Sequence, residues 1–285
     1  MCRLFGMTAG TAEVHATFWL LDAPDSMADQ NVRNADGAGI GWFDAHGDAH
    51  LRKRPGEALA DKGLRERAEE VDVVSVVTHV RAATAGSDNI DNCHPFEMDG
   101  LLVAHNGGFS DLKAVEAQLG DYRDLVHGDT DSERYAALIA KETAAHDGDV
   151  GAGIVAAADW LRTHVPLYSL NTVVISKDGM WALRYPDQRA LHIARRVVHP
   201  GTGAPDDGWQ GSSSLAGHQV VGTSETPIVV VASERVDDSA DWLMLQPGEL
   251  IAVDRELTIT SRLALHGPPK QLLVLSEQDP NRESF

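Results

Sequence analysis

Apolar residues in the first third of the chain come in short runs typical of strands. Residues 4–8 form such a run, and residues 37–43 form another that opens from a glycine turn. Residues 49–54 can pair with the second run across the turn at 45–48. Residues 71–80, VDVVSVVTHV, are rich in β-branched side chains and predict a buried strand. A helix is expected at 64–70, and a further strand is expected at 101–105.

The middle of the chain changes to a helical pattern. Residues 131–145 are rich in alanine, with Thr130 or Asp131 as the expected N-cap. Residues 150–164 carry apolar side chains at helical spacing, which suits packing on a sheet. Two consecutive helices of this kind predict one outer layer of the fold.

Strand-like segments return after Pro166. The expected strands are 172–176, 180–185, 191–195, 219–222, 228–232 and 250–254. Residues 201–215 contain glycine, serine and acidic residues and predict a surface loop, with a lid over the site as the alternative. The polar residues 268–285 predict a peripheral or poorly ordered tail. Strands, then two helices, then strands fit an α+β fold and not a βαβ alternation.

The overall charge limits the classes of partner. The 285 residues include 43 acidic and 24 basic side chains, which give a formal charge of −19. This balance argues against nucleic acid and against an anionic membrane surface. The N-terminus has no basic segment followed by an apolar run, and no stretch approaches the roughly 18 apolar residues of a spanning helix. We therefore expect a cytoplasmic protein with no membrane partner.

The chain has two cysteines, Cys2 and Cys93, which are too few for a disulfide framework. Cys2 becomes the N-terminal residue once Met1 is removed. Its thiolate would then be a strong nucleophile, and its α-amino group, with an ordinary pKa of about 8, could relay a proton near neutral pH. Cys93 is expected to be a buried or half-buried thiol.

Polar and catalytic residue types recur in four segments within one quarter of the chain. These segments are 79–84 (HVRAAT), 92–96 (NCHPF), 104–108 (AHNGG) and 128–133 (GDTDSE). Together with Met1-Cys2-Arg3, in this order, they resemble the class II glutamine amidotransferases, which are N-terminal-nucleophile (Ntn) hydrolases. The resemblance is specific over residues 1–133 and weaker over 172–254, where Ser233-Glu234 and residues 246–250 also match.

The resemblance implies a binding site for the head group of a free amino acid. The guanidinium of Arg81 would grip the α-carboxylate of glutamine, and the carboxylate of Asp131 would hold the α-ammonium. Thr84 would add a hydroxyl beside the carboxylate. The residue types suit these roles, because a planar guanidinium matches a carboxylate bidentately and a carboxylate pairs with an ammonium.

The resemblance also implies the groups that carry the reaction. Cys2 would be the nucleophile. The side-chain amide of Asn106 and the backbone N–H of Gly107 would form the oxyanion hole, where donors meet the charge that develops in the transition state. The histidines of the motif region do not predict a metal site, because spacings such as H-E-x-x-H or paired C-x-x-C are missing. No cofactor is expected.

The implied fold is a four-layer αββα sandwich of two antiparallel sheets with helices outside. Its amidotransferase domain would cover residues 2–255, and residues 256–285 would form a peripheral or partly disordered C-terminal extension. No segment of synthase size follows residue 255. The chain is therefore expected either to work with a separate ammonia-accepting synthase or to hydrolyse an amide on its own.

The implied activity is hydrolysis of the linear side-chain amide of glutamine, or of a γ-glutamyl amide, through a thioester on Cys2. Stand-alone relatives include the γ-glutamyl amidohydrolase of ergothioneine biosynthesis, which cleaves a γ-glutamyl amide of a larger molecule. Ala82 and Ala85 stand where synthase-linked relatives usually carry tryptophan and histidine, which puts specificity for free glutamine in question. A catalytically silent amino-acid-binding module is the non-enzymatic alternative. The sequence leaves the oligomeric state open, a homo-oligomer included.

Overall fold

The structure is a computed structural model. It describes residues 2–17, 19–20, 23, 26–27, 31, 36–56, 72–81, 89–198, 225–237 and 240–274. Five sequence predictions lie outside these residues: the helix at 64–70, the position of Thr84, the loop at 201–215, the strand at 219–222 and the end of the tail after residue 274.

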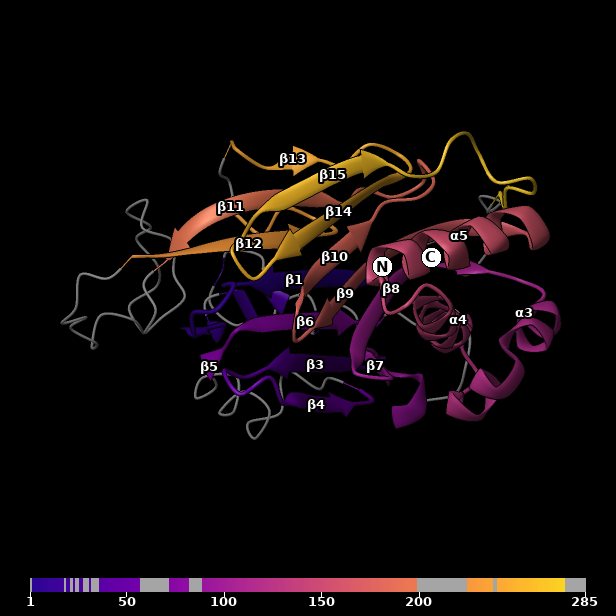
Figure 1. Cartoon of the computed structure of the whole chain (residues 1–285), viewed down its shortest axis with the longest axis horizontal. Coiled ribbons are helices and arrows are strands. Elements are labelled where there is room, and N and C mark those ends of the chain that lie inside the picture. Colours follow the sequence, from indigo (N-terminus) through magenta and orange to yellow (C-terminus); the bar gives the residue numbers. More distant parts are fainter. Residues whose placement is uncertain are drawn as a thin grey trace.

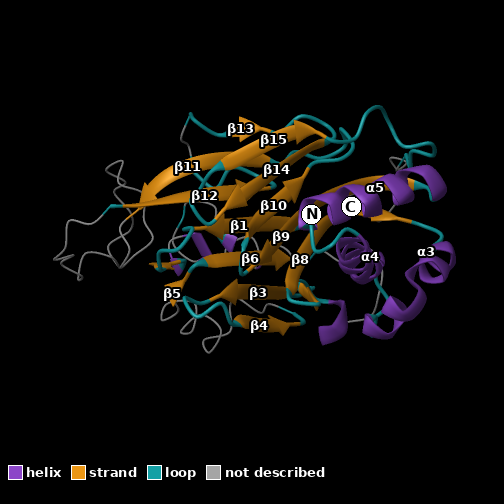
Figure 2. Ribbon diagram, viewed as in Figure 1, coloured by secondary structure: helices purple, strands orange, loops and turns teal. Residues whose placement is uncertain are grey.

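The described part of the chain forms two large antiparallel sheets (Figures 1 and 2). The first sheet has the order β13-β11-β12-β1-β6-β3-β4. Its strands are β1 (Arg3–Thr8), β3 (Ala38–Phe43), β4 (Ala49–Arg54), β6 (Ser75–Val80), β11 (His192–Val198), β12 (Thr226–Ala232) and β13 (Leu243–Met244). Every pairing in this sheet is antiparallel. The strand that begins directly after Cys2 thus lies in the middle of the sheet, between β12 and β6.

The second sheet has the order β15-β14-β10-β9-β8-β7. Its strands are β7 (Phe96–Met98), β8 (Leu101–Phe109), β9 (Leu167–Ser176), β10 (Gly179–Leu183), β14 (Glu249–Asp254) and β15 (Ile259–Leu263). These pairings are antiparallel as well. A small separate sheet pairs β2 (Val14–His15) with β5 (Asp72–Val73).

The two large sheets pack face to face. Alternate side chains of β1 pack between the sheets and against the outer side of the first sheet. Leu4 packs between the sheets together with Ala104 of β8 and Val173 of β9. Phe5 and Met7 point to the opposite face and join the core there. Burial of such side chains contributes about 1.5–3 kcal/mol each.

The sheets approach closely at Gly6 of β1. A Cβ atom at this position would lie 2.6 Å from Cγ1 of Val173. Any side chain here would push the sheets apart, so glycine allows β1 to run directly over β9. The close approach brings the start of β1 near strands of the other sheet.

Helices cover the outer face of the second sheet (Figure 2). They are α3 (Leu112–Leu119), α4 (Asp131–Ala145) and α5 (Val150–His164), with the short 3-10 segments η3 (Ile90–Asn92) and η4 (Gly120–Leu125). On the outer face of the first sheet, Trp19, Leu20 and Met27 join the core. The α+β fold with two stacked antiparallel sheets is confirmed. No helix in the described ranges is both long and apolar enough to span a membrane.

The end of the chain extends the second sheet beyond what the hydrophobic pattern suggested. β15 pairs with β14 along its whole length. Leu167 of β9 exchanges two backbone hydrogen bonds of 2.9 Å, one with Gln271 and one with Leu273. The domain boundary after residue 255 stays a prediction, with the structure adding that residues 259–273 contact this sheet.

Candidate active site

Cys2 stands at the open end of β1, between two neighbouring strands. Arg3 is the register partner of Val80 on β6, and Phe5 is the partner of Ala232 on β12. Continuing both antiparallel registers to Cys2 places Arg81 on its β6 side and the residues after β12 on its other side. Cys2 therefore has Arg81 on one side in the sheet and the residues that follow β12 on the other.

The backbone of Cys2 is fixed by two side chains. Its carbonyl oxygen accepts a hydrogen bond of 3.1 Å from Nδ2 of Asn106 and another of 3.3 Å from Nη1 of Arg3. Arg3 is held in turn by Glu234, with Nη2 2.9 Å from Oε1. Cys2 itself is partly exposed. The peptide plane that carries the thiol is thus oriented, while the residue stays open to a substrate.

Asn106 and Gly107 come from β8 of the opposite sheet, and the Asn106 side chain joins the two sheets at Cys2. The Oδ1 atom of Asn106 is buried and makes no hydrogen bond with any described residue. Gly107 is the only position of β8 that is not buried. A Cβ atom at Gly107 would lie 1.9 Å from the carbonyl oxygen of Ser169, so no other residue fits without moving β9. Asn106 thus contacts Cys2, and Gly107 is the next residue of β8. Their roles as oxyanion donors stay a prediction.

Asp131 is the first residue of α4, and this helix start is tied to the end of β8. Oδ2 of Asp131 accepts a hydrogen bond of 3.1 Å from the backbone N–H of Phe109. Thr130 is the N-cap and accepts from the N–H of Glu133 at 3.3 Å, which decides between the two predicted caps. The start of α4 and the end of β8 thus hold the Asp131 carboxylate at Phe109, which is two residues after Gly107.

Arg81 follows β6 directly and is only 4 % exposed. Its backbone N–H donates to the carbonyl of Gly37 at 2.8 Å, and its Nη1 donates to the carbonyl of Asp36 at 3.5 Å. Thr84, the third predicted head-group residue, lies outside the described residues. The structure thus joins Cys2 directly to Asn106, sets Arg81 beside Cys2 in the sheet, and links Asp131 to the strand that carries Asn106 and Gly107.

His105 positions this strand and is not available as a base. Its Nδ1 lies 2.9 Å from Oγ of Ser132, and its Nε2 lies 3.1 Å from the carbonyl oxygen of Ser169. A carbonyl can only accept, so Nε2 carries the proton and Nδ1 accepts from the hydroxyl. Burial lowers the pKa of His105, which keeps the ring neutral. His105 therefore connects β8, β9 and the start of α4 next to the candidate site.

His79 and His94 form a buried pair of histidines, with ring centroids 4.0 Å apart. All four of their ring nitrogens are buried without a hydrogen bond in the described part of the chain. Burial lowers the pKa of His79 to about 3 and lowers the pKa of His94 well below its ordinary value. Among the described residues, no group of three or more His, Cys, Asp or Glu side chains could hold a metal ion.

Acid should destabilise the fold through this histidine pair. Between about pH 6.5 and the lowered pKa values, the two imidazoles are protonated in the unfolded chain and neutral in the folded protein. The free energy of unfolding therefore falls as the pH falls. The limiting slope is about 1.4 kcal/mol per pH unit for each histidine. Urea unfolding from pH 7.5 to 5.0 measures it, and His79→Gln should flatten the curve. A variant with the same slope as the unsubstituted protein would contradict this assignment.

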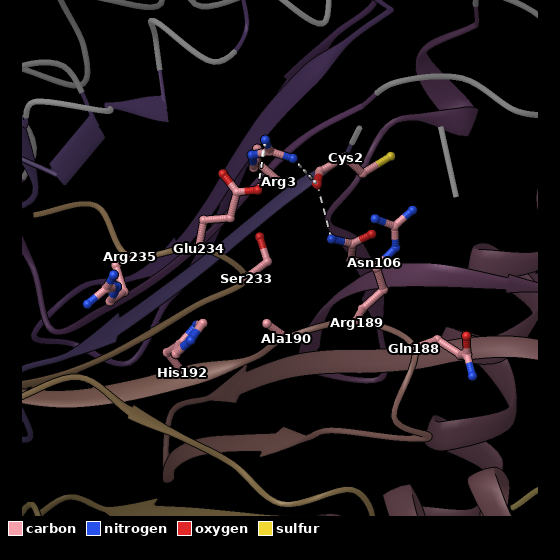
Figure 3. Close-up of a pocket in the computed structure, with 10 residues that line it drawn as sticks. All are labelled: Cys2, Arg3, Asn106, Gln188, Arg189, Ala190, His192, Ser233, Glu234 and Arg235. Carbon is pink, nitrogen blue, oxygen red and sulfur yellow. Dashed lines mark hydrogen bonds and ion pairs between the residues drawn. The ribbon is translucent and has the colours of Figure 1, made fainter. Parts of the chain in front are cut away.

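A cavity of about 490 Å³ opens beside Cys2. Figure 3 shows its lining: Cys2, Arg3, Asn106, Gln188, Arg189, Ala190, His192, Ser233, Glu234 and Arg235. Neither Arg81 nor Asp131 lines it. Ser233 and Glu234 belong to a segment noted in the sequence, whereas Gln188, Arg189, His192 and Arg235 carried no sequence signal. They meet Cys2 only because β12 and β11 follow β1 in the sheet.

A family profile described as "Glutamine amidotransferases class-II" matches residues 1–268. The "Probable glutamine amidotransferase DUG3" of Saccharomyces cerevisiae is 31 % identical over 135 residues, which are 41 % of this chain and 38 % of that protein. YafJ of Escherichia coli, also named a glutamine amidotransferase, is 28 % identical over 267 residues, 87 % of this chain and 96 % of its own length.

Other relatives are much longer than the matched region. A glutamine–fructose-6-phosphate aminotransferase of Mesorhizobium japonicum is 30 % identical over 120 residues, which are 42 % of this chain and 19 % of that enzyme. The chain thus covers well under two thirds of the yeast and Mesorhizobium relatives, and nearly all of YafJ.

Solved structures show the same fold at low sequence identity. Glutamine phosphoribosylpyrophosphate amidotransferase from B. subtilis, complexed with ADP and GMP, has a TM-score of 0.63 at 19 % identity, covering 95 % of this chain and 51 % of that one. A glutamine aminotransferase class-II domain protein from Silicibacter pomeroyi has a TM-score of 0.58 at 20 % identity, covering 92 % and 98 %. At these identities the likeness concerns the fold.

Proposed function

The chain belongs to the class II glutamine amidotransferases, and from this premise we propose that it hydrolyses γ-glutamyl amides through a thioester on Cys2. The observation that carries the proposal is the hydrogen bond between Asn106 and the Cys2 carbonyl. It brings the predicted nucleophile and a predicted oxyanion donor together from two different sheets.

The first half of the reaction forms the thioester. Arg81, Asp131 and Thr84 hold the α-carboxylate and the α-ammonium of the glutamyl group, and the thiolate of Cys2 attacks its side-chain carbonyl carbon. The N–H donors of Asn106 and Gly107 stabilise the oxyanion that develops. The C–N bond then breaks, and the departing amine takes the thiol's proton through the α-amino group of Cys2.

The second half releases glutamate. Water attacks the thioester carbon, the C–S bond breaks, and the thiol of Cys2 is restored. The same oxyanion donors serve this step, because the second tetrahedral intermediate carries its charge at the same place. For free glutamine the released amine is ammonia, whereas for a substituted amide it is a larger amine. Met1 must be removed before the α-amino group of Cys2 is available.

Two substrate types fit this chemistry. Free glutamine with a separate ammonia-accepting synthase is one. The Mesorhizobium relative is named a glutamine–fructose-6-phosphate aminotransferase, which supports free glutamine as the nitrogen source. A larger γ-glutamyl amide, of the kind cleaved in ergothioneine biosynthesis, is the other. The cavity of about 490 Å³ beside Cys2 favours the second type, because ammonia needs little more room than the roughly 30 Å³ that one water occupies.

Glutamate release tests the proposed function. Protein shown by mass to lack Met1 is incubated with L-glutamine, with γ-L-glutamylglycine and with L-asparagine, which is one methylene shorter. We expect glutamate from at least one γ-glutamyl substrate and no comparable turnover of asparagine. Absence of hydrolysis from every γ-glutamyl substrate would contradict the proposal and favour a silent binding module.

A further inference from the structure

We propose that the cavity beside Cys2 binds the amine portion of a γ-glutamyl amide and recognises a carboxylate on it, so that the preferred substrates are γ-glutamyl amino acids or short γ-glutamyl peptides. This inference rests on the proposed function, because it names the substrate class of the same site. Of the residues assigned above to catalysis and head-group binding, Cys2 and Asn106 line the cavity. The other lining residues have no role in the proposed function.

The sheet order separates the two ends of such a substrate. Arg81 lies on the β6 side of Cys2, whereas His192 is paired with Ala232 on the β12 side. A glutamyl head group bound by Arg81 therefore leaves its scissile carbonyl at Cys2 and directs the amide nitrogen toward the β12 side. The substituent on that nitrogen enters the cavity. In Figure 3, Arg235 lies on the opposite side of the lining from Cys2, Asn106 and Gln188.

The cavity is positively charged in a strongly acidic protein. Its lining contains three arginines and one glutamate, while the whole chain has a formal charge of −19. Glu234 is engaged by Arg3 at 2.9 Å. Arg235 is exposed and forms no ion pair with any described residue. A cavity of this charge favours an anionic group and disfavours a cationic one.

Arg189 is delivered into the cavity by a fixed loop. Its carbonyl oxygen accepts from Nε of Arg184 at 2.8 Å and from Nδ2 of Asn171 at 3.3 Å. The same Asn171 amide donates to the carbonyl of Ala190 at 2.9 Å. The guanidinium of Arg189 lies over the ring of Tyr168, 5.5 Å from its centroid, and its side chain points toward Asn106 and Cys2 (Figure 3). The positive group is thus held near the scissile bond before any ligand arrives.

His192 adds a neutral polar group to the same wall. Burial lowers its pKa, and the nearby positive charge of Arg235 lowers it further. Its Nδ1 is buried and makes no hydrogen bond in the described part of the chain. A neutral imidazole can donate or accept a hydrogen bond with a polar ligand, and it carries no charge that would repel a ligand of either sign.

The reaction requires the ligand to be an amine, and we assign its anionic group as a carboxylate. The group that leaves must be an amine, and an amine that carries a carboxylate is an amino acid or a peptide. Arginine binds carboxylates through paired N–H donors. The cavity volume of about 490 Å³ lies within the usual range for small-molecule sites and suits such a product.

Two nearly isosteric substrates test the inference. γ-L-Glutamylglycine carries the carboxylate, and γ-L-glutamylglycinamide replaces it with a neutral amide. We expect kcat/KM of the purified protein to be at least about tenfold higher for the acid, as a charge-assisted hydrogen bond predicts. Arg189→Gln should reduce this ratio toward one, and Arg189→Lys should retain part of it. Arg262→Gln, an exposed arginine on β15, is the matched control and should leave the ratio unchanged.

The outcomes separate this inference from the proposed function. A ratio near one in the unsubstituted protein, or a ratio that neither Arg235→Gln nor Arg189→Gln changes, would overturn the carboxylate site while leaving amide hydrolysis intact. Hydrolysis of glutamine with neither glycine derivative cleaved would do the same. Failure to hydrolyse any γ-glutamyl compound would remove both. A γ-glutamyl aminomethylphosphonate cleaved much faster than the acid would make the cavity a phosphonate or phosphate site instead.

Discussion

Cys2→Ala protein is expected to fold normally and to lose amide hydrolysis by at least about 10⁴-fold, since removal of a covalent nucleophile leaves only binding and oxyanion stabilisation. Cys2 precedes β1 and is partly exposed, so truncation of its side chain leaves no cavity in the core. The residual rate is measured as glutamate release from the best γ-glutamyl substrate.

The second cysteine is the matched control for this result. Cys93 is buried, as the sequence predicted, and its thiol lies 3.5 Å from the carbonyl oxygen of Asn89. Cys93→Ala should lower the melting temperature modestly and keep kcat within a few fold. An active Cys2→Ala protein, or an inactive but folded Cys93→Ala protein, would require another nucleophile.

Replacement of Arg81 by glutamine is expected to reduce kcat/KM for a γ-glutamyl substrate by about 30-fold or more, mainly by raising KM. The reason is that loss of one partner from a buried charge-assisted pair costs about 2–5 kcal/mol. Arg81→Lys should recover only part of the loss, because lysine keeps the charge and lacks the planar fork. Steady-state kinetics together with circular dichroism check both variants.

A substrate without the α-carboxylate distinguishes head-group binding from a structural role of Arg81. 4-Aminobutanamide has the amide and the amine of glutamine and lacks the carboxylate. The unsubstituted protein and Arg81→Gln should cleave it with similar, low kcat/KM. If the variant lost a similar factor on this compound as well, Arg81 would be supporting the fold and not the substrate.

The sequence predicted the parts of the site that depend on local pattern. The β-branched run that ends at Val80 predicted a strand leading to Arg81, and β6 ends there. The alanine-rich run after Thr130 predicted a helix whose first residue is Asp131, and α4 begins there. In both cases periodicity and capping act over a few residues and can be read directly from the chain.

Boundaries set by strand pairing were less predictable. The strand expected at 101–105 continues to Phe109 because β9 offers partners as far as Leu167. Asn106 and Gly107 therefore lie within β8 and not after it. The run at 71–80 divides into β5 and β6, each pairing with a different sheet. The hydrophobic pattern of a strand does not indicate which other strand it will pair with.

The charged cavity could not be predicted from the sequence. Arg189 and Arg235 are separated from Cys2 by more than 180 residues. Arg189 stands in a connection without a motif, and Arg235 follows the matched Ser233-Glu234 without belonging to that match. They become neighbours only through the order β11-β12-β1, a set of long-range pairings that local propensity does not encode.

The most direct test of the account is the intact mass of the purified protein before and after incubation with a diazo-ketone analogue of glutamine. The account predicts a chain that has lost Met1 and gains a single adduct, which peptide mapping places on Cys2 and which excess glutamine or γ-glutamyl amide slows. A processed chain that stays unlabelled, or one labelled at Cys93 instead, would contradict Cys2 as the nucleophile of a glutamyl-specific site.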